Sequence, residues 1–521
     1  MAAPPGNDIY IVSDLHLGEG WNTRTQRYSR LEMFFYDQSF GEFIDHIIAQ
    51  CRDNGRTASL VLNGDIFDFL AVVATPMDSN TTSRFGRAAQ HFGLGTTEKE
   101  SVWKMRNILA GHPTWVEALT RLLRAGHSLV MIRGNHDAEL YWPAVQKELT
   151  STIVANAPES EQESLRSLIE FRQWFLYEPD RYFIEHGNQY DTTNAFRFVT
   201  NPVLPPEYHA DQQVMLDLPM GSLFMRYLYN KMRLLDPYTT HFVTLEQYLR
   251  ITYHHNFVDL LRMGTIHVPY FFRAIREARL FEQQGMAPVK REHETRMEAL
   301  AQESDLGDKL GAVERLAKRP IGTTKYNLLK QILRPVVRSS LTFVGLTLLS
   351  VLGWFYIFNF IQETEWLTRG LLGKSSLQAV LAVVTFIGLF LGFSFVNRAL
   401  HRGSDPGEDG NFEIAKKIAA LLNVPCVSMG HTHGAQLRHF DGGAYANSGT
   451  WIPHPGPWDT LTPGARQFTF VTIIGTDMSL RRWNTDAKRA EAVILLDDYR
   501  PTTLERLLTD DREPARLPEE G

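Results

Sequence analysis

Five short apolar stretches occur along the chain, and a polar turn follows each of them directly. The stretches are residues 9–12, 59–62, 129–132, 182–184 and 424–427. Runs of this length and composition are typical of buried β-strands. The turns contain Asp14 and His16, Asp65 and Asp68, Asn135 and His136, His186, and His431 and His433. Because ligands gather beyond the carboxyl ends of strands in layered α/β folds, we expect these side chains to meet at one rim.

Helical periodicity separates the predicted strands. Apolar residues recur on one side of residues 39–54 and 115–123, and Gly55 and Gly126 are expected to end these two helices. Residues 71–97 are expected to be irregular, and 405–410 a loop before a helix at 412–422. Further strands are predicted at 436–440, 468–474 and 479–483, and they would complete two packed sheets.

The pattern changes between residues 191 and 410, where a long insertion is expected. Helices are predicted at 222–235, 245–263 and 268–284, and then a charged helix or linker at 289–317. The first of these helices is apolar except for a narrow polar stripe of Arg226, Asn230 and Arg233. Two interpretations remain open for it: a helix lying in a membrane interface, and a helix packed between protein layers.

Two apolar stretches within the insertion, 341–361 and 377–396, contain no charged residue. Each has about the 20 residues that a helix needs to cross a bilayer. Glycines in both stretches would let the helices approach closely, and the short linker at 362–376 predicts a hairpin. The alternative is a buried helical pair in a soluble core.

Basic residues predict the orientation of this hairpin. They flank its outer ends, with no acid among those before the first stretch, whereas the two in the linker are offset by Glu363 and Glu365. The flanking residues are Lys318, Arg319, Lys325, Lys330, Arg334, Arg338, Arg398 and Arg402. The positive-inside rule therefore places both flanks, and the catalytic domain with them, in the cytoplasm of an integral membrane protein.

The composition agrees with this placement and narrows the classes of partner. The chain has 521 residues, of which 44% are hydrophobic and 21% charged, and its net charge of -6 does not favour a nucleic-acid partner. Its two cysteines, Cys51 and Cys426, cannot build a disulfide framework, and both are expected to be buried thiols. The amino terminus does not have the pattern of a secretory signal.

The residue types in the turns indicate a metal site. Carboxylate, imidazole and amide oxygen together suit a divalent transition metal such as Mn, Fe or Zn. They are numerous enough for two metals that share one carboxylate, an arrangement that can clamp the attacking and leaving oxygens of a phosphoryl displacement. The alternative is a coincidental set of turn-forming residues, with the histidines satisfied in the core.

The order of these motifs resembles the calcineurin-like metallophosphoesterase superfamily. The resemblance is carried by Asp14-x-His16, Gly64-Asp65-x-x-Asp68, Gly134-Asn-His-Asp137, His186 and Gly430-His-x-His433, and it covers about residues 7–200 and 411–485. It implies an α/β fold, a four-layer αββα sandwich, here interrupted by a helical insertion and the transmembrane hairpin. The metallophosphoesterase domain is expected in two segments, 1–200 and 403–485. Between them lie the insertion at 201–330, as a lid or interfacial region, and the hairpin at 331–402. A charged tail follows at 486–521.

The resemblance also implies how the ligands divide. One metal would be held by Asp14, His16, Asp65 and His433, and the other by Asp65, Asn135, His186 and His431, with Asp65 bridging. Mn is the favoured metal, with Fe or Zn as alternatives. A hydroxide bridging the two metals would attack phosphorus in line with the leaving group.

Four further residues receive roles beside the metals. By resemblance, His136 is not a ligand, and it would protonate or support the departing oxygen. Asp137 is expected to orient the His136 imidazole, and Asp68 to support a metal ligand. Arg133 is expected to hold phosphate oxygens, with a surface ion pair as its alternative.

The substrate class follows from local similarity and from the hairpin. Residues 13–18, 186–191 and 447–451 are similar to the branch that contains UDP-diacylglucosamine pyrophosphohydrolases, although Asn188 stands where that branch commonly has Asp. The first hypothesis is a membrane-anchored phosphoesterase that cleaves a lipid-linked phosphate or pyrophosphate. The alternatives are a phosphodiesterase or phosphatase for soluble substrates, with the hairpin only as an anchor, and a non-catalytic membrane scaffold. The oligomeric state stays open.

Overall fold

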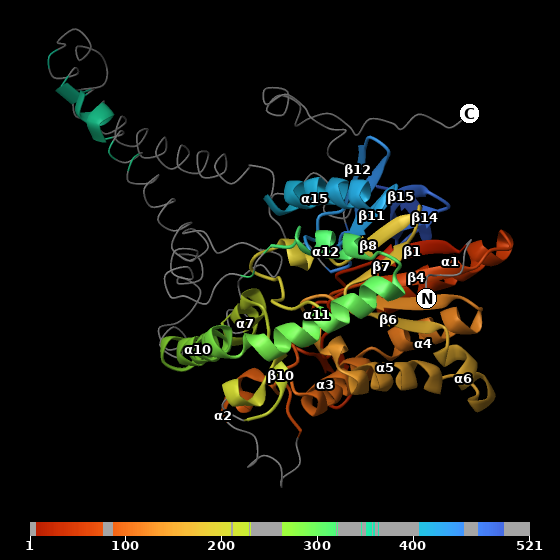
Figure 1. Cartoon of the computed structure of the whole chain (residues 1–521), viewed down its shortest axis with the longest axis horizontal. Helices are drawn as coiled ribbons and strands as arrows, with labels where there is room; N and C mark the ends of the chain where they lie inside the picture. Colours follow the sequence, from red (N-terminus) through yellow and green to blue (C-terminus); the bar gives the residue numbers. More distant parts are fainter. Residues whose placement is uncertain are drawn as a thin grey trace, which may run out of the picture.

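Two β-sheets face each other, and helices cover their outer sides (Figure 1). The structure is a computed structural model that describes residues 7–76, 87–209, 212–228, 230, 263–318, 320, 406–452 and 467–493, with single positions and short runs between 345 and 363. The mixed α/β sandwich that the sequence predicted is confirmed.

The larger sheet joins the beginning and the end of the described chain. Its strands, in spatial order, are β16 (Arg489–Ala492), β15 (Asp477–Asn484), β14 (Thr469–Ile474), β1 (Asp8–Val12), β4 (Ala58–Asn63), β5 (Ser128–Ile132) and β6 (Ile169–Arg172). Strands β1, β4, β5 and β6 are parallel, whereas β14 pairs with β1 in the antiparallel direction. The turns after β1, β4 and β5 therefore lie at the same edge of this sheet.

The smaller sheet carries the remaining two turns. Its strands, in spatial order, are β12 (Gln436–Phe440), β13 (Gly443–Asn447), β11 (Cys426–Met429), β8 (Tyr182–Glu185) and β7 (Phe175–Glu178). Strands β8 and β11 are parallel neighbours, with Phe183 beside Val427. The turn after β8 thus lies beside the turn after β11, although the whole insertion separates them along the chain.

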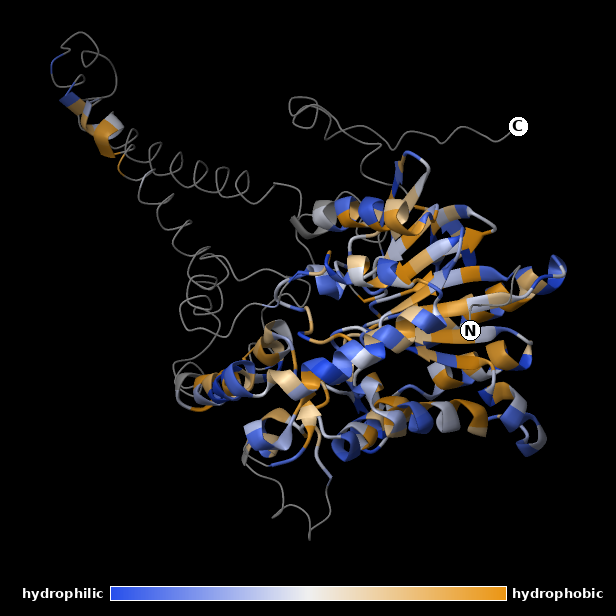
Figure 2. Ribbon diagram, viewed as in Figure 1, coloured by the Kyte–Doolittle hydropathy of each residue, from blue (hydrophilic) through white to orange (hydrophobic). Residues whose placement is uncertain are grey.

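Three buried apolar clusters define the layers. One lies between the sheets and includes Ile11, Ile184 and Cys426. A second lies between the larger sheet and α1 (Asp37–Asp53), α3 (Glu98–Gly111), α4 (Pro113–Arg124) and α5 (Pro143–Ala155). The third lies between the smaller sheet and α15 (Pro406–Leu422), α12 (Asp308–Glu314) and one side of α11 (Met286–Glu303). Figure 2 accordingly colours the strands largely hydrophobic and α11 largely hydrophilic.

The predicted helices at 39–54 and 115–123 are α1 and α4, and their apolar sides are buried as expected. Phe43, Ile47 and Cys51 of α1 belong to the second cluster. Cys51 and Cys426 are both buried and free.

Three local predictions were wrong. Residues 406–410 continue α15 and do not form a loop, because helix formation starts at Pro406, a residue suited to a first helical turn. Residues 87–92 form the helix α2 (Arg87–Phe92) within the region expected to be irregular. The sequence analysis also missed β13, because a strand with Gly443, Ala444 and Ala446 has little β-propensity and owes its place to its neighbours in the sheet.

The described part of the insertion is mainly helical. It contains α7 (Met220–Tyr227), α10 (Val268–Gln284), α11 and α12, with a two-stranded sheet of β9 (Val203–Leu204) and β10 (Met215–Leu216) before them. The charged segment after residue 289 is not simply solvated, because His293 and Met297 of α11 are buried. His293 contacts Thr200 through Nδ1 at 2.6 Å and Glu314 through Nε2 at 2.8 Å. The helix predicted at 245–263 lies outside the described residues except for its last position.

Only part of the predicted transmembrane hairpin can be compared with the structure. Residues 351–356 of the first stretch are helical, and Leu352 and Tyr356 are 65% and 75% exposed. The second stretch, 377–396, lies outside the described residues. Among the residues that the structure describes, no helix is both long and apolar enough to cross a bilayer. The transmembrane hairpin therefore gains no support here and stays a prediction.

Candidate metal centre

Side chains from five turns converge into neighbouring groups of metal-ligating atoms. In one group the ligand atoms of Asp14, His16 and His433 lie within 4.8 Å of one another, and the same limit holds for Asp65, His186 and His431. A third group, His16, Asp68 and His136, shares a histidine with the first. The structure thus brings together the predicted imidazole and carboxylate ligands in two groups, and Asp65, the expected bridging ligand, falls in the second of them.

The turns hold these residues in an uncommon backbone conformation. Non-glycine residues with positive φ include Asp14 (54°), His16 (51°), Asp65 (52°), His431 (69°) and His433 (59°). Such residues cost free energy and cluster at functional sites, where the surrounding structure enforces them. All five are predicted ligands, so the predicted rim is built on turns whose conformation the surrounding structure must hold.

The first group packs closely around the Asp14 carboxylate. His433 Nε2 lies 3.2 Å from Asp14 Oδ1 and also 3.2 Å from His16 Nε2. The other oxygen, Oδ2, accepts hydrogen bonds from the His431 backbone N–H at 3.1 Å and from the Ser13 hydroxyl. One carboxylate oxygen and two imidazole nitrogens therefore face one another at the distances of a cation site.

The second group is fixed by a contact to the backbone of β4. His186 Nδ1 lies 2.9 Å from the Asn63 carbonyl, so this nitrogen carries the proton and Nε2 faces the site. Nε2 lies 3.2 Å from Asp65 Oδ2. Burial opposes ionisation of Asp65, but the neighbouring His186 and His136 prevail and lower its pKa. Asp65 is thus a carboxylate, as a metal ligand must be.

Asn135 completes the predicted ligand set with an amide oxygen. The residue is 2% exposed, and its Oδ1 accepts no hydrogen bond from the described part of the chain. A buried amide oxygen without a partner costs free energy unless a ligand satisfies it. Together with the two groups of imidazoles and carboxylates, this oxygen fits a site for divalent cations.

His136 pairs with Asp68 and not with Asp137. Its Nδ1 lies 3.3 Å from Asp68 Oδ1, and the second oxygen of Asp68 lies 3.8 Å from His16 Nδ1. Burial disfavours the charged imidazole, but the Asp68 and Asp65 carboxylates outweigh it and raise the pKa of His136 to about 9. In this arrangement His136 holds a proton at neutral pH.

The role expected for Asp137 is corrected by its contacts. Its carboxylate accepts the backbone N–H of Gly134 at 2.6 Å and of Ile66 at 2.9 Å. Burial and the neighbouring Asp65 raise the pKa of Asp137 to about 7. Asp137 therefore joins the turn after β4 to the turn after β5, and Asp68 takes the position beside the His136 ring.

Arg133 is not in a surface ion pair. The side chain is 4% exposed and lies over the Phe196 ring, with 4.9 Å between its Cζ and the ring centre. It donates from Nη2 to the Val199 carbonyl, whereas Nε and Nη1 have no hydrogen-bond partner in the parts of the chain that the structure describes. Its contact with a phosphate stays a prediction.

Asp191 is a residue of this site that the sequence analysis missed. Its carboxylate Oδ2 lies 3.2 Å from His431 Nε2, which leaves Nδ1 as the nitrogen that can bind a metal. Asn447 also supports the last motif, because its Nδ2 donates to the Gly430 carbonyl at 2.7 Å. Asp191 and Asn447 stand in the stretches 186–191 and 447–451, which the sequence analysis had already singled out, and that was the available signal.

The insertion lies against the metal turns. Ser222 of α7 donates to the Asn135 carbonyl at 3.3 Å, Asn230 donates to the Leu70 carbonyl at 2.7 Å, and Arg226 donates to the Leu94 carbonyl at 2.6 Å. The polar stripe of this helix thus faces the catalytic domain as far as residue 230, and Arg233 lies outside the described residues. Of the two interpretations, the described residues fit a helix packed between protein layers.

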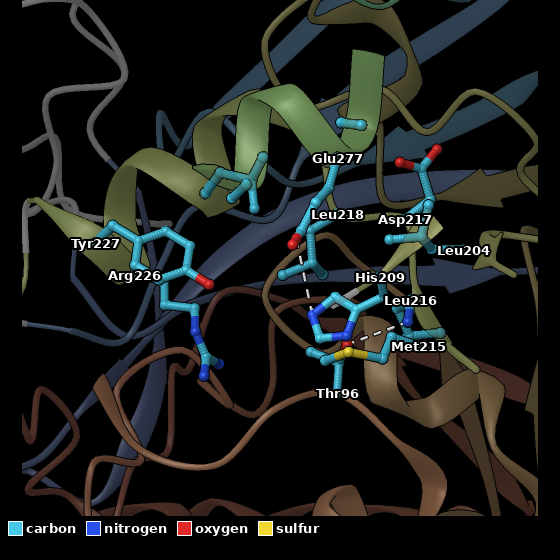
Figure 3. Close-up of a pocket in the computed structure, with 13 residues that line it drawn as sticks. Thr96, Leu204, His209, Met215, Leu216, Asp217, Leu218, Arg226, Tyr227 and Glu277 are labelled. Atoms are coloured by element: carbon cyan, nitrogen blue, oxygen red, sulfur yellow. Dashed lines mark hydrogen bonds and ion pairs between the residues drawn. The ribbon is translucent and has the colours of Figure 1, made fainter. Parts of the chain in front are cut away.

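A small cavity lies where the insertion meets the catalytic domain (Figure 3). Its volume is about 60 Å³, and Leu218, Leu223 and Tyr227 are among its apolar walls. His209 and Glu277 lie 3.8 Å apart on its polar side. The cavity shows that α7 and α10 do not close completely over β10.

The comparison with known families identifies the first part of the chain. Residues 8–217 match the family model described as calcineurin-like phosphoesterase. No curated protein matches the chain. The matched range contains all the predicted ligands except His431 and His433, which the fold brings to the same rim. The chain therefore carries a calcineurin-like phosphoesterase domain, and it is a hydrolase that acts on phosphoester bonds.

Proposed function

We propose that this hydrolase works with two divalent cations, Mn²⁺ by preference, and acts on a lipid-linked phosphate or pyrophosphate. The observation that carries the two-metal part is the convergence of Asp14, His16 and His433 beside Asp65, His186 and His431. When bound, the two cations would acidify water and neutralise charge on the phosphoryl group. Asp65 would be shared between them, and Asn135 would add its orphaned oxygen.

His136 supplies the proton for the leaving group in this proposal. Its imidazole is paired with the Asp68 carboxylate and keeps a proton at neutral pH. A positioned acid of this kind contributes about 10²–10⁴-fold to a rate. Asp68 holds the ring, and Asp137 keeps the backbone of the two turns together.

The lipid part of the proposal depends on the long apolar stretches and on the insertion. Residues 341–361 and 377–396 would anchor the chain in a bilayer, with the catalytic domain in the cytoplasm. The insertion packs on the Asn135 turn through Ser222, so material next to the anchor would border the site. The local similarity to the pyrophosphohydrolase branch supports a lipid-linked pyrophosphate as substrate.

The substrate test compares two phosphoesters on detergent-purified, Mn²⁺-loaded full-length protein. We expect faster initial rates on a nucleotide-linked lipid pyrophosphate than on a soluble aryl phosphodiester, with His136→Ala as the blank. Turnover of the soluble diester alone would refute the lipid assignment and leave a phosphodiesterase for soluble substrates. A metal-loaded protein that is inert on both would favour the non-catalytic scaffold.

The anchoring has its own test, because it is independent of the substrate. A tag inserted in the linker at 362–376 should be inaccessible from the cytoplasm in intact cells. A cytoplasmic tag would refute the hairpin without touching the metal centre.

A further inference from the structure

A fully buried ion pair lies beneath the two turns that carry Asp68 and His136. Lys104 of α3 and Glu139 of η1 (Ala138–Tyr141) are both 0% exposed, and their Nζ and Oε1 atoms lie 3.2 Å apart. Glu139 Oε2 is buried and has no hydrogen-bond partner among the described residues. The pair is outside the metal-ligating groups, and neither residue has a part in the chemistry proposed above.

The pair connects the two turns from behind. Lys104 Nζ donates to the Phe69 carbonyl at 3.3 Å, directly after Asp68, and it contacts Glu139 two positions after Asp137. The Phe69 N–H in turn donates to the His136 carbonyl at 3.2 Å. Lys104 therefore links the turn that carries Asp68 to η1, which directly follows the turn that carries His136.

Stability alone is a poor reason for burying these charges. Taking an ammonium and a carboxylate out of water costs several kcal/mol each, and well-packed apolar side chains of similar volume are often as stable or more so. An apolar pair could fill the same space, but it could not bond the Phe69 carbonyl and the η1 turn simultaneously. The charged pair therefore adds a side-chain link between the two turns, beside the links made by Asp137 and by the Phe69 N–H.

We propose that Lys104 and Glu139 are positioning residues that hold Asp68 against the His136 imidazole, and so keep His136 aligned with the leaving oxygen. The inference rests on the proposed function of His136 as the acid. It assigns the pair no contact with the substrate or with a metal. Loss of the pair should therefore affect turnover more than substrate binding or metal content.

The test uses full-length protein with Lys104→Met and Glu139→Leu combined, so that no single charge is left buried. We expect kcat to fall about 10–100-fold, the range seen when supporting residues are removed, while KM and the number of bound Mn²⁺ ions stay unchanged. The matched control is Arg106→Met with Glu148→Leu, which removes a partly exposed ion pair between α3 and α5. The control should retain the wild-type kcat.

A leaving-group series separates positioning from a general loss of structure. If His136 is misaligned, poor alkyl leaving groups should lose more rate than a good aryl leaving group, because only the poor ones need the proton. In a His136→Ala background the double substitution should cost nothing further. Should the double variant not fold, Lys104→Gln, which is too short to reach both turns, should give the same leaving-group pattern.

Two outcomes would overturn the inference: an equal loss for all leaving groups, and an undiminished loss in the His136→Ala background. Failure of the proposed function would look different. In that case His136→Ala would turn over substrate as fast as wild type. The rates of these two proteins are compared before the Lys104 and Glu139 variants are assayed.

Discussion

Gly64 lies where the backbone passes closest to a predicted metal ligand. Its φ is +79°, and a Cβ added there would lie 2.5 Å from Cγ and Nδ1 of His186. No real pair of such atoms comes so close, so a Gly64→Ala substitution must move either the β4 turn or the imidazole. Movement of the ring would break the 2.9 Å contact of Nδ1 with the Asn63 carbonyl, which keeps Nε2 facing the site.

The expected magnitude has two parts. The left-handed backbone costs an alanine about 1–2 kcal/mol of stability. Displacing His186 should in addition weaken metal binding about 10–100-fold, the usual effect of disturbing the partner of a metal-ligating histidine. The second part is the one that reports on the metal centre.

Gly126 provides the matched control for Gly64. Its φ is +85°, and an added Cβ would meet nothing within 4 Å. Gly126→Ala should therefore lose a similar amount of stability and no metal affinity. Calorimetric titration with Mn²⁺ and thermal unfolding of both variants measure the two parts separately.

The result that would refute this reasoning is unchanged Mn²⁺ affinity in a folded Gly64→Ala variant. His186 would then tolerate displacement, and its place in the metal centre would be wrong. Equal losses of affinity in both variants would attribute the effect to backbone strain instead.

Two further predictions concern groups around the metal turns. Asp191→Asn should weaken Mn²⁺ binding about 10-fold or more, because His431 loses the carboxylate that fixes its ring. Titration with Mn²⁺ measures this, and a variant with wild-type affinity would show that Asp191 does not support His431. His112 is buried between Asp37 and Glu32, and although burial opposes it, these carboxylates raise its pKa from 6.5 to about 9. His112 should therefore contribute about 3 kcal/mol to the free energy of unfolding. This contribution should be fully present below pH 6.5 and lost as the pH rises through 9. The stability difference between wild type and His112→Gln, followed against pH, checks this, and a pH-independent difference would contradict it.

The strands and turns that form the site could be predicted because their signals are local. An apolar run followed by Asp14, Asp65 or His186 fixes both the strand and the position of the polar side chain at its end. Parallel pairing of β8 with β11 then brings His186 and His431 together, however many residues separate the two strands in the sequence.

The supporting contacts could not be predicted because they are not local. Asp137 is adjacent to His136 in the sequence, yet its carboxylate turns to the N–H groups of Gly134 and Ile66, while the more distant Asp68 faces the imidazole. Side chains of successive residues in a tight turn diverge, so adjacency was a misleading guide. The burial of Arg133 likewise depends on Phe196 and Val199, which approach it only in the folded chain.

The central claim is that these turns form a two-metal centre in which His136 is catalytic and not a ligand. The most direct measurement is the Mn²⁺ content per chain, with phosphoester turnover, of purified full-length wild type, His136→Ala and Asp65→Asn. The proposed function predicts that His136→Ala keeps the metal content of wild type and loses most turnover, whereas Asp65→Asn loses metal, because the carboxylate proposed to be shared by both sites is gone. A metal-replete Asp65→Asn protein with normal turnover would contradict the account.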